Sequence, residues 1–159
     1  MWVDDLATGV IAATDLQPGD NSGQSVVCLM NAGTSDLAIT LSAIDVVDTE
    51  TDCTGDEEAA GDTTCGTGEF QGELALALIA SASRLDCDTS ASQLAISPAF
   101  QSLADAPVAF GTLAAGEKTC VWLAVQMATP GQIGTTVETI QQAQTDKVEW
   151  RYAFDGTPS

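Results

Sequence analysis

Five cysteines are the side chains of this sequence with the clearest capacity for covalent chemistry. Cys53 and Cys65 lie in one polar, acidic stretch, where a disulfide would close a short loop and stabilise the fold by about 2–3 kcal/mol. Cys87 and Cys120 are the preferred second pair, and Cys28 with Cys120 is the alternative. Because the number is odd, one cysteine stays free or pairs with another chain. The pattern predicts an oxidising, extracellular location.

Carboxylates are the second candidate for chemistry, because the chain has 23 acidic and 4 basic residues and a net charge of −19. Calcium takes about six to eight oxygen ligands and tolerates irregular loops. The acidic residues near the end of one predicted strand are therefore weak calcium candidates: Asp45, Asp48, Glu50 and Asp52. Their spacing matches no EF-hand, so a solvated acidic loop is the alternative interpretation. We expect no cofactor beyond calcium at these residues.

The lack of histidine removes most catalytic arrangements. Without it the chain can hold no Ser-His-Asp triad, no Cys-His pair and no HExxH zinc site. The cysteines lack CxxC spacing, and no glycine-rich phosphate-binding motif stands between a strand and a helix. Carboxylates are too abundant to single out a glycosidase pair. We therefore expect that the protein is not an enzyme.

Charge and hydropathy also limit the partners of the chain. Nucleic acid binding needs clustered lysine and arginine, which the net charge of −19 opposes. No apolar run approaches the roughly 18–20 residues that span a bilayer. No basic region precedes an apolar core, so we expect a secreted mature chain whose signal peptide has been removed. The sequence thus predicts neither nucleic acid binding nor membrane insertion of the mature chain.

Alternating apolar residues indicate that strands position these side chains. Between turns rich in Gly, Pro and Asn, strands are predicted at residues 25–30, 37–48, 108–113, 119–127 and 147–154. The stretch 119–127 is apolar on both faces, which is typical of a strand covered on both sides. Residues 73–82 are rich in helix formers, but alternation from Leu74 to Ala80 favours a strand.

A short helix is expected at residues 97–103, with Ser97 as N-cap and Pro98 at the first helical position. Phe100 and Leu103 would then point inward together. Strands outnumber helices and do not alternate with long ones. The fold class is therefore all-β: a jelly-roll-like antiparallel β-sandwich with one or two short helices.

The first fifteen residues differ from the rest. They carry apolar side chains without a helix cap: Trp2, Val3, Leu6, Val10 and Ile11. Such a segment needs a partner surface. We interpret residues 1–15 as an N-terminal arm, either a strand given to another chain or one packed on its own domain, and residues 16–159 as a single domain.

Three turns precede strands in a characteristic order along the chain. Residues 16–20, Leu-Gln-Pro-Gly-Asp, precede a strand and then an Asn-Ala-Gly turn at 31–33. Residues 113–117, Leu-Ala-Ala-Gly-Glu, precede the strongest strand, and residues 144–154 are first polar and then alternating. This order resembles that of the TasA/camelysin family of secreted surface proteins, including the closing strand of the family. The acidic insert between Cys53 and Cys65 also resembles that of some members.

The resemblance implies a jelly-roll domain and assembly into extracellular fibres of a biofilm matrix or cell surface. Some members assemble by donor-strand exchange, in which an N-terminal segment completes the sheet of the next subunit. The resemblance thus implies a pilus-like homopolymer whose donor strand is the arm of residues 1–15. Camelysin is described as a metallopeptidase, an activity that a chain without histidine does not support. The alternative function is a monomeric secreted β-sandwich that binds carbohydrate or calcium through Trp122 or Trp150 and the acidic loop.

Overall fold

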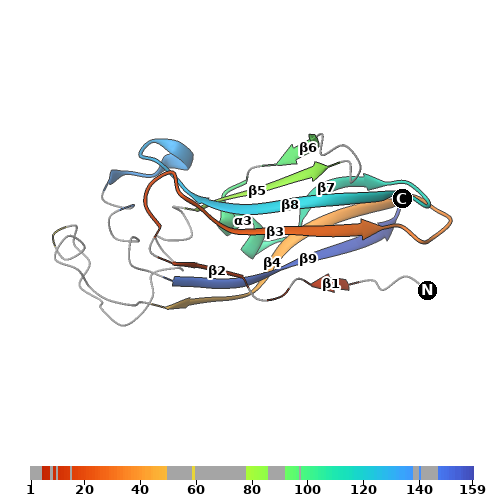
Figure 1. Ribbon diagram of the computed structural model, residues 1–159, viewed down its shortest axis with the longest axis horizontal. Helices are drawn as coiled ribbons and strands as arrows, with labels where there is room; N and C mark the ends of the chain where they lie inside the picture. Colours follow the sequence, from red (N-terminus) through yellow and green to blue (C-terminus); the bar gives the residue numbers. More distant parts are fainter. Residues whose placement is uncertain are drawn as a thin grey trace.

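Two antiparallel sheets face each other across an apolar core (Figure 1). The computed structural model describes residues 5–7, 9, 11–14, 16–49, 59, 78–85, 92–96, 98–137, 140 and 147–159. The first sheet, named the β9 sheet, consists of β1 (Asp5–Ala7), β2 (Ile11–Thr14), β9 (Lys147–Pro158), β4 (Leu37–Thr49) and β7 (Val108–Leu113). The second, named the β8 sheet, has the order β3 (Asn21–Met30), β8 (Lys118–Met127), β5 (Leu78–Leu85) and β6 (Ser92–Ile96). The predicted all-β sandwich is confirmed.

The core fills the space between the sheets, as period-two alternation requires. Its largest fully buried side chains come from both sheets, from the helix α3 (Phe100–Asp105) and, with Ile140, from the segment before β9: Trp150, Tyr152, Phe100, Phe110, Leu41, Leu78, Leu103, Leu113, Leu123, Met127 and Ile140. The Trp150 ring stands edge-on to Phe100 at 5.1 Å and to Tyr152 at 5.9 Å between ring centroids. Such aromatic pairs add about 0.5–1.5 kcal/mol each to the energy of burial.

Strand β8 confirms the prediction for residues 119–127. It lies between β3 and β5, and its face formed by Val121, Leu123 and Val125 is completely buried. The opposite face carries the half-buried Trp122 and the buried Ala124. A central strand needs apolar residues on both faces when both are covered, which is why this stretch has the strongest strand signal of the chain.

Helix α3 begins later than its sequence signals indicated. Its N-cap is Ala99, and the carbonyl of Pro98 accepts a hydrogen bond from the Ala80 amide at 3.0 Å. Pairing with β5 therefore takes priority over helix formation at Pro98, and the expected Pro98 start is wrong. Phe100 and Leu103 are both buried, as predicted. The six-residue helix packs against β4 and β5, closing one side of the core (Figure 1).

Segments of β3, β9 and β6 also differ from the sequence prediction. Strand β3 begins at Asn21, because a register shift between Ser22 and Ser25 absorbs residues that read as a turn. Strand β9 continues to Pro158, because residues expected to form a tail pair with the start of β4. Strand β6 was not predicted at all. In each case pairing with a neighbouring strand decides the conformation of a weakly apolar segment.

Asn31 joins two turns that are far apart in the sequence. Its side chain, completely buried, donates to the carbonyls of Ser35 at 2.8 Å and Leu113 at 3.0 Å. Its own carbonyl accepts from the Gly116 amide at 2.9 Å. The β3–β4 turn and the β7–β8 turn, two of the three turns that carry the family resemblance, therefore form one hydrogen-bonded end of the sandwich.

The buried hydroxyl of Tyr152 should make the folded protein less stable as the pH becomes alkaline. Burial raises the pKa of its hydroxyl well above the usual value, and contact with Trp150 lowers this pKa by a smaller amount. The unfolded chain releases this proton above about pH 10, while the folded chain keeps it. The stability that this group contributes is therefore complete below about pH 10 and falls above it, by up to about 1.4 kcal/mol per pH unit.

Replacing Tyr152 with phenylalanine tests this pH dependence. Urea denaturation between about pH 9 and 11 should show a shallower decline in the free energy of unfolding for Tyr152→Phe than for the unaltered protein. Equal slopes for both proteins would contradict the assignment.

Candidate functional site

The N-terminal strands lie on the edge of the β9 sheet. Strand β1 pairs antiparallel with residues 153–155 of β9, and β2 pairs with residues 147–150. Ala13 stands opposite Val148 and is 2% exposed, while the half-buried Ile11 stands opposite Trp150. Figure 1 shows β2 beside β9 and close to β3 of the other sheet. The apolar arm thus has a partner surface, and in this structure that surface is its own β9.

The residues predicted to form the donor strand are placed only in part. Ile11 packs against the core, and Leu6 pairs with Phe154 through its backbone. Trp2, Val3 and Val10 lie outside the described residues. The prediction overlooked Ala13, the buried residue of β2, although its position two residues after Ile11 is a strand signal. Its small side chain made it inconspicuous in the sequence.

A turn fixed to β8 separates the arm from the domain. Gly19 has a φ of 89°, which favours glycine, and its amide donates to the carbonyl of Met127 at 2.8 Å. The Met127 amide returns a bond to the carbonyl of Asp20 at 3.0 Å. The side chain of Gln126 donates to the carbonyl of Gly19 at 3.0 Å. Any movement of the arm would therefore begin before this turn, and residues from Gly19 onward stay with the sandwich.

The calcium candidates are not gathered into a site in the part of the chain that is described. Asp45 lies at a register shift of β4, where its φ of 51° is one that aspartate tolerates better than most residues. Its carboxylate forms an ion pair with the guanidinium of Arg151 on β9. The backbone of Asp48 pairs with Val148, while Glu50 and Asp52 lie outside the described residues. No group of three metal-ligating side chains occurs among the described residues.

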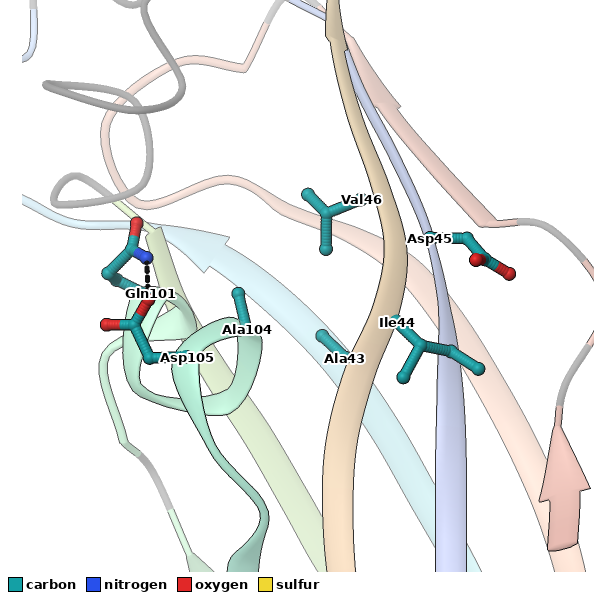
Figure 2. A pocket seen from close by; sticks show the side chains of 7 residues that line it. All are labelled: Ala43, Ile44, Asp45, Val46, Gln101, Ala104 and Asp105. Atoms are coloured by element: carbon teal, nitrogen blue, oxygen red, sulfur yellow. Dashed lines mark hydrogen bonds between the residues drawn. The ribbon is translucent and has the colours of Figure 1, made fainter.

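A hollow of about 600 Å³ lies between this part of β4 and helix α3 (Figure 2). Ala43 and Val46 point toward the helix, whereas the Asp45 carboxylate points away from it, as Figure 2 shows. The two polar side chains that α3 contributes, Gln101 and Asp105, are hydrogen-bonded to each other. In a binding or catalytic pocket, several polar groups point into the cavity. The polar side chains that line this hollow do not have that arrangement.

The cysteines occupy distinct states. Cys28 on β3 is an exposed free thiol, and Cys120 on β8 is disulfide-bonded. Cys28 and Cys120 lie opposite each other in the two strands. Cys53, Cys65 and Cys87 lie outside the described residues, so the Cys53–Cys65 and Cys87–Cys120 pairings stay predictions.

Comparison of the chain with protein-family models, curated proteins and solved structures finds no match. In the described part of the chain, no helix has the length and apolar character needed to cross a membrane. The candidate site therefore rests on the geometry of the arm, β9 and the anchored turn.

Proposed function

We propose that this protein is the structural subunit of an extracellular, pilus-like or biofilm-matrix filament. Subunits join head to tail by donor-strand complementation, in which the N-terminal arm of one subunit replaces β1 and β2 on β9 of the next. The proposal includes secretion of the chain and no enzymatic activity. The resemblance of its turns to the TasA/camelysin family supports this function.

The observation that carries the proposal is the attachment of the arm. Among the described residues, β1 and β2 are hydrogen-bonded as strands to β9 alone. They are short, with three and four residues, whereas β9 has twelve. A short edge strand that precedes an anchored turn can leave without breaking any pairing between other strands.

Exchange between subunits would conserve the contacts of the arm. Once the arm leaves, β9 becomes an open edge, whose unpaired amide and carbonyl groups favour the addition of a strand. An arm from a second copy restores the same register, so the exchange costs little once the arm is released. Because each subunit gives one arm and accepts another, the contact is heterologous and can propagate as an open filament.

The strand order supports a jelly roll as the architecture of the subunit. Reading β2, β9, β4 and β7 in one sheet and β3, β8, β5 and β6 in the other, consecutive strands from β2 to β5 alternate between the sheets, as do β7, β8 and β9. Two interlocked antiparallel sheets of this kind are typical of jelly rolls. In that arrangement the edge of β9 opposite β4 is covered by the N-terminal strands, which precede the rest of the fold in the sequence and are therefore available for exchange.

A monomeric secreted binding module is the second candidate function. The packing of the arm on its own β9 favours it, because the sandwich is then complete without a neighbour. Trp150 cannot present itself to a ligand there, since it is fully buried, which leaves the half-buried Trp122. Light scattering at high protein concentration, with and without calcium, separates the two candidates, because only the filament subunit grows in mass.

Deletion of residues 1–15 tests the filament directly. We expect the truncated protein to form no filaments by negative-stain imaging under conditions in which the full chain assembles. Circular dichroism of the truncated protein, with and without a synthetic peptide of residues 1–15, controls for loss of fold. The peptide should raise the melting temperature by occupying β9. Filaments formed by the truncated protein would refute the mechanism.

Salt should promote assembly, because subunits with a net charge of −19 repel each other. The screening length falls from about 30 Å at 0.01 M to about 8 Å at 0.15 M ionic strength. We therefore expect the rate of assembly, followed by light scattering, to rise across this range. A divalent chloride at equal ionic strength serves as comparison for specific cation binding. Equal rates at low and high salt would exclude repulsion as the barrier.

A further inference from the structure

Two cysteine sulfurs make an unusually close contact on the β8 sheet. Cys28 and Cys120 are direct partners in the antiparallel β3–β8 pair, and their Sγ atoms lie 3.0 Å apart. A disulfide bond is about 2.05 Å long, and even non-bonded carbon atoms, which are smaller than sulfur, pack at about 3.5–4.0 Å. The two sulfurs are therefore closer than packed neighbours and are not bonded to each other.

The two sulfurs differ in oxidation state. Cys120 is already disulfide-bonded, while Cys28 is a free thiol exposed to solvent. The cysteine bonded to Cys120, called here the third cysteine, lies outside the described residues. A free thiol thus contacts one sulfur of an existing disulfide, which is the arrangement from which thiol–disulfide exchange starts.

We propose that Cys28 and Cys120 form a thiol–disulfide exchange site. The Cys28 thiol loses its proton to solvent, and its thiolate attacks Sγ of Cys120. The Cys28–Cys120 bond forms as the bond between Cys120 and the third cysteine breaks, and the third cysteine leaves as a thiolate that takes up a proton. One disulfide and one thiol exist before and after the step, so no oxidant or reductant is needed.

The sheet geometry permits the product without rearrangement. Directly opposed residues of antiparallel strands have Cα atoms about 4.5–5.5 Å apart, within the range of about 4.4–6.8 Å that a disulfide spans. Both side chains point to the outer face of the β8 sheet. There Cys28 lies between Val26, 61% exposed, and Met30, 49% exposed, so solvent and reagents reach it.

The exchange makes two covalent links mutually exclusive. In one state Cys120 holds the third cysteine, and in the other the Cys28–Cys120 disulfide joins the edge strand β3 to the central strand β8. The free thiol moves accordingly between β3 and the third cysteine. This site is independent of the arm on β9, so it stands whether or not the protein forms filaments.

Alkylation of the native protein tests the site. N-ethylmaleimide traps whichever thiol is free, and peptide mapping without reduction locates both the label and the disulfide. At high reagent concentration, trapping outruns exchange and the label should lie mainly on Cys28. At low reagent concentration, exchange precedes trapping, and we expect at least a several-fold larger share of label on the third cysteine. Those molecules should contain the Cys28–Cys120 disulfide.

Two variants complete the experiment. Cys28→Ser should keep Cys120 bonded to the third cysteine and leave that cysteine unlabelled at every reagent concentration. Met30→Ser, which changes an exposed residue on the same face of β3, should exchange as the unaltered protein does. Label on Cys28 alone at all reagent concentrations in the unaltered protein would overturn the proposal, as would labelling of the third cysteine in Cys28→Ser.

Discussion

Replacing Trp150 with alanine should lower the free energy of unfolding by about 3–5 kcal/mol, the range for large aromatic residues removed from a core. The indole is completely buried, and it contacts Phe100 and Tyr152 through edge-on ring packing. It also stands opposite Ile11 of β2. Its loss would leave a cavity where helix α3, β9 and the N-terminal arm meet. Urea unfolding followed by circular dichroism measures the effect without relying on tryptophan fluorescence.

Trp122 provides the matched control for this prediction. It is also a tryptophan in a strand, but it lies half-buried on the outer face of β8. Trp122→Ala should therefore cost clearly less than Trp150→Ala, since little cavity forms at a partly exposed site. If Trp150→Ala reduces stability below what can be measured, Phe100→Leu offers a milder change in the same cluster. Equal losses for the two tryptophan variants would contradict the position of Trp150 in the core.

Strands with strong alternation could be predicted from the sequence. Strand β7 was predicted with the bounds that the structure has, and β8 differs by a single residue at its start. Their inward residues, such as Phe110 and Leu123, are large and regularly spaced, so the local pattern alone determines which face is buried. For these segments the local sequence pattern is enough to predict both the strand and the face that it buries.

Segments whose conformation depends on a distant partner could not be predicted. Strand β9 runs on to Pro158 because the start of β4 supplies hydrogen bonds, which no local pattern reveals. Helix α3 starts after Pro98 because the Pro98 carbonyl bonds to β5. Pairing with β9 likewise decides at which edge of the sheet the arm lies.

The same limit applies to the two candidate sites. The sequence indicated that residues 1–15 need a partner surface, but only the strand register identifies β9 as that surface. The sequence also offered Cys28–Cys120 as a pair, whereas the structure has both sulfurs in contact and in different oxidation states. Contacts between β3 and β8 join residues 92 positions apart, beyond the range of any local signal.

Locking the arm onto its own β9 should prevent assembly. Ala12 and Glu149 stand directly opposite each other on the outer face, at a separation that suits a disulfide. In the double variant Ala12→Cys with Glu149→Cys, oxidation would tie β2 to β9 within one chain. Because the arm then cannot reach a neighbour, we expect assembly to fall to background. Reductant should restore it, with the unaltered protein under the same reductant as the control for its native disulfides.

The two single variants reveal which chain supplies the arm. When Ala12→Cys and Glu149→Cys proteins are mixed, assembled and oxidised, donor-strand complementation places the introduced cysteines of different chains in contact. Non-reducing electrophoresis with peptide mapping should then show covalent dimers joined through positions 12 and 149. Each single variant assembled alone lacks this link, which controls for dimers formed through the exposed Cys28. Filaments that form from the locked double variant with its disulfide intact would show that the arm is not the donor. A cross-linked mixture would show that β9 accepts the arm of a neighbour, because the register that closes the monomer also joins the chains.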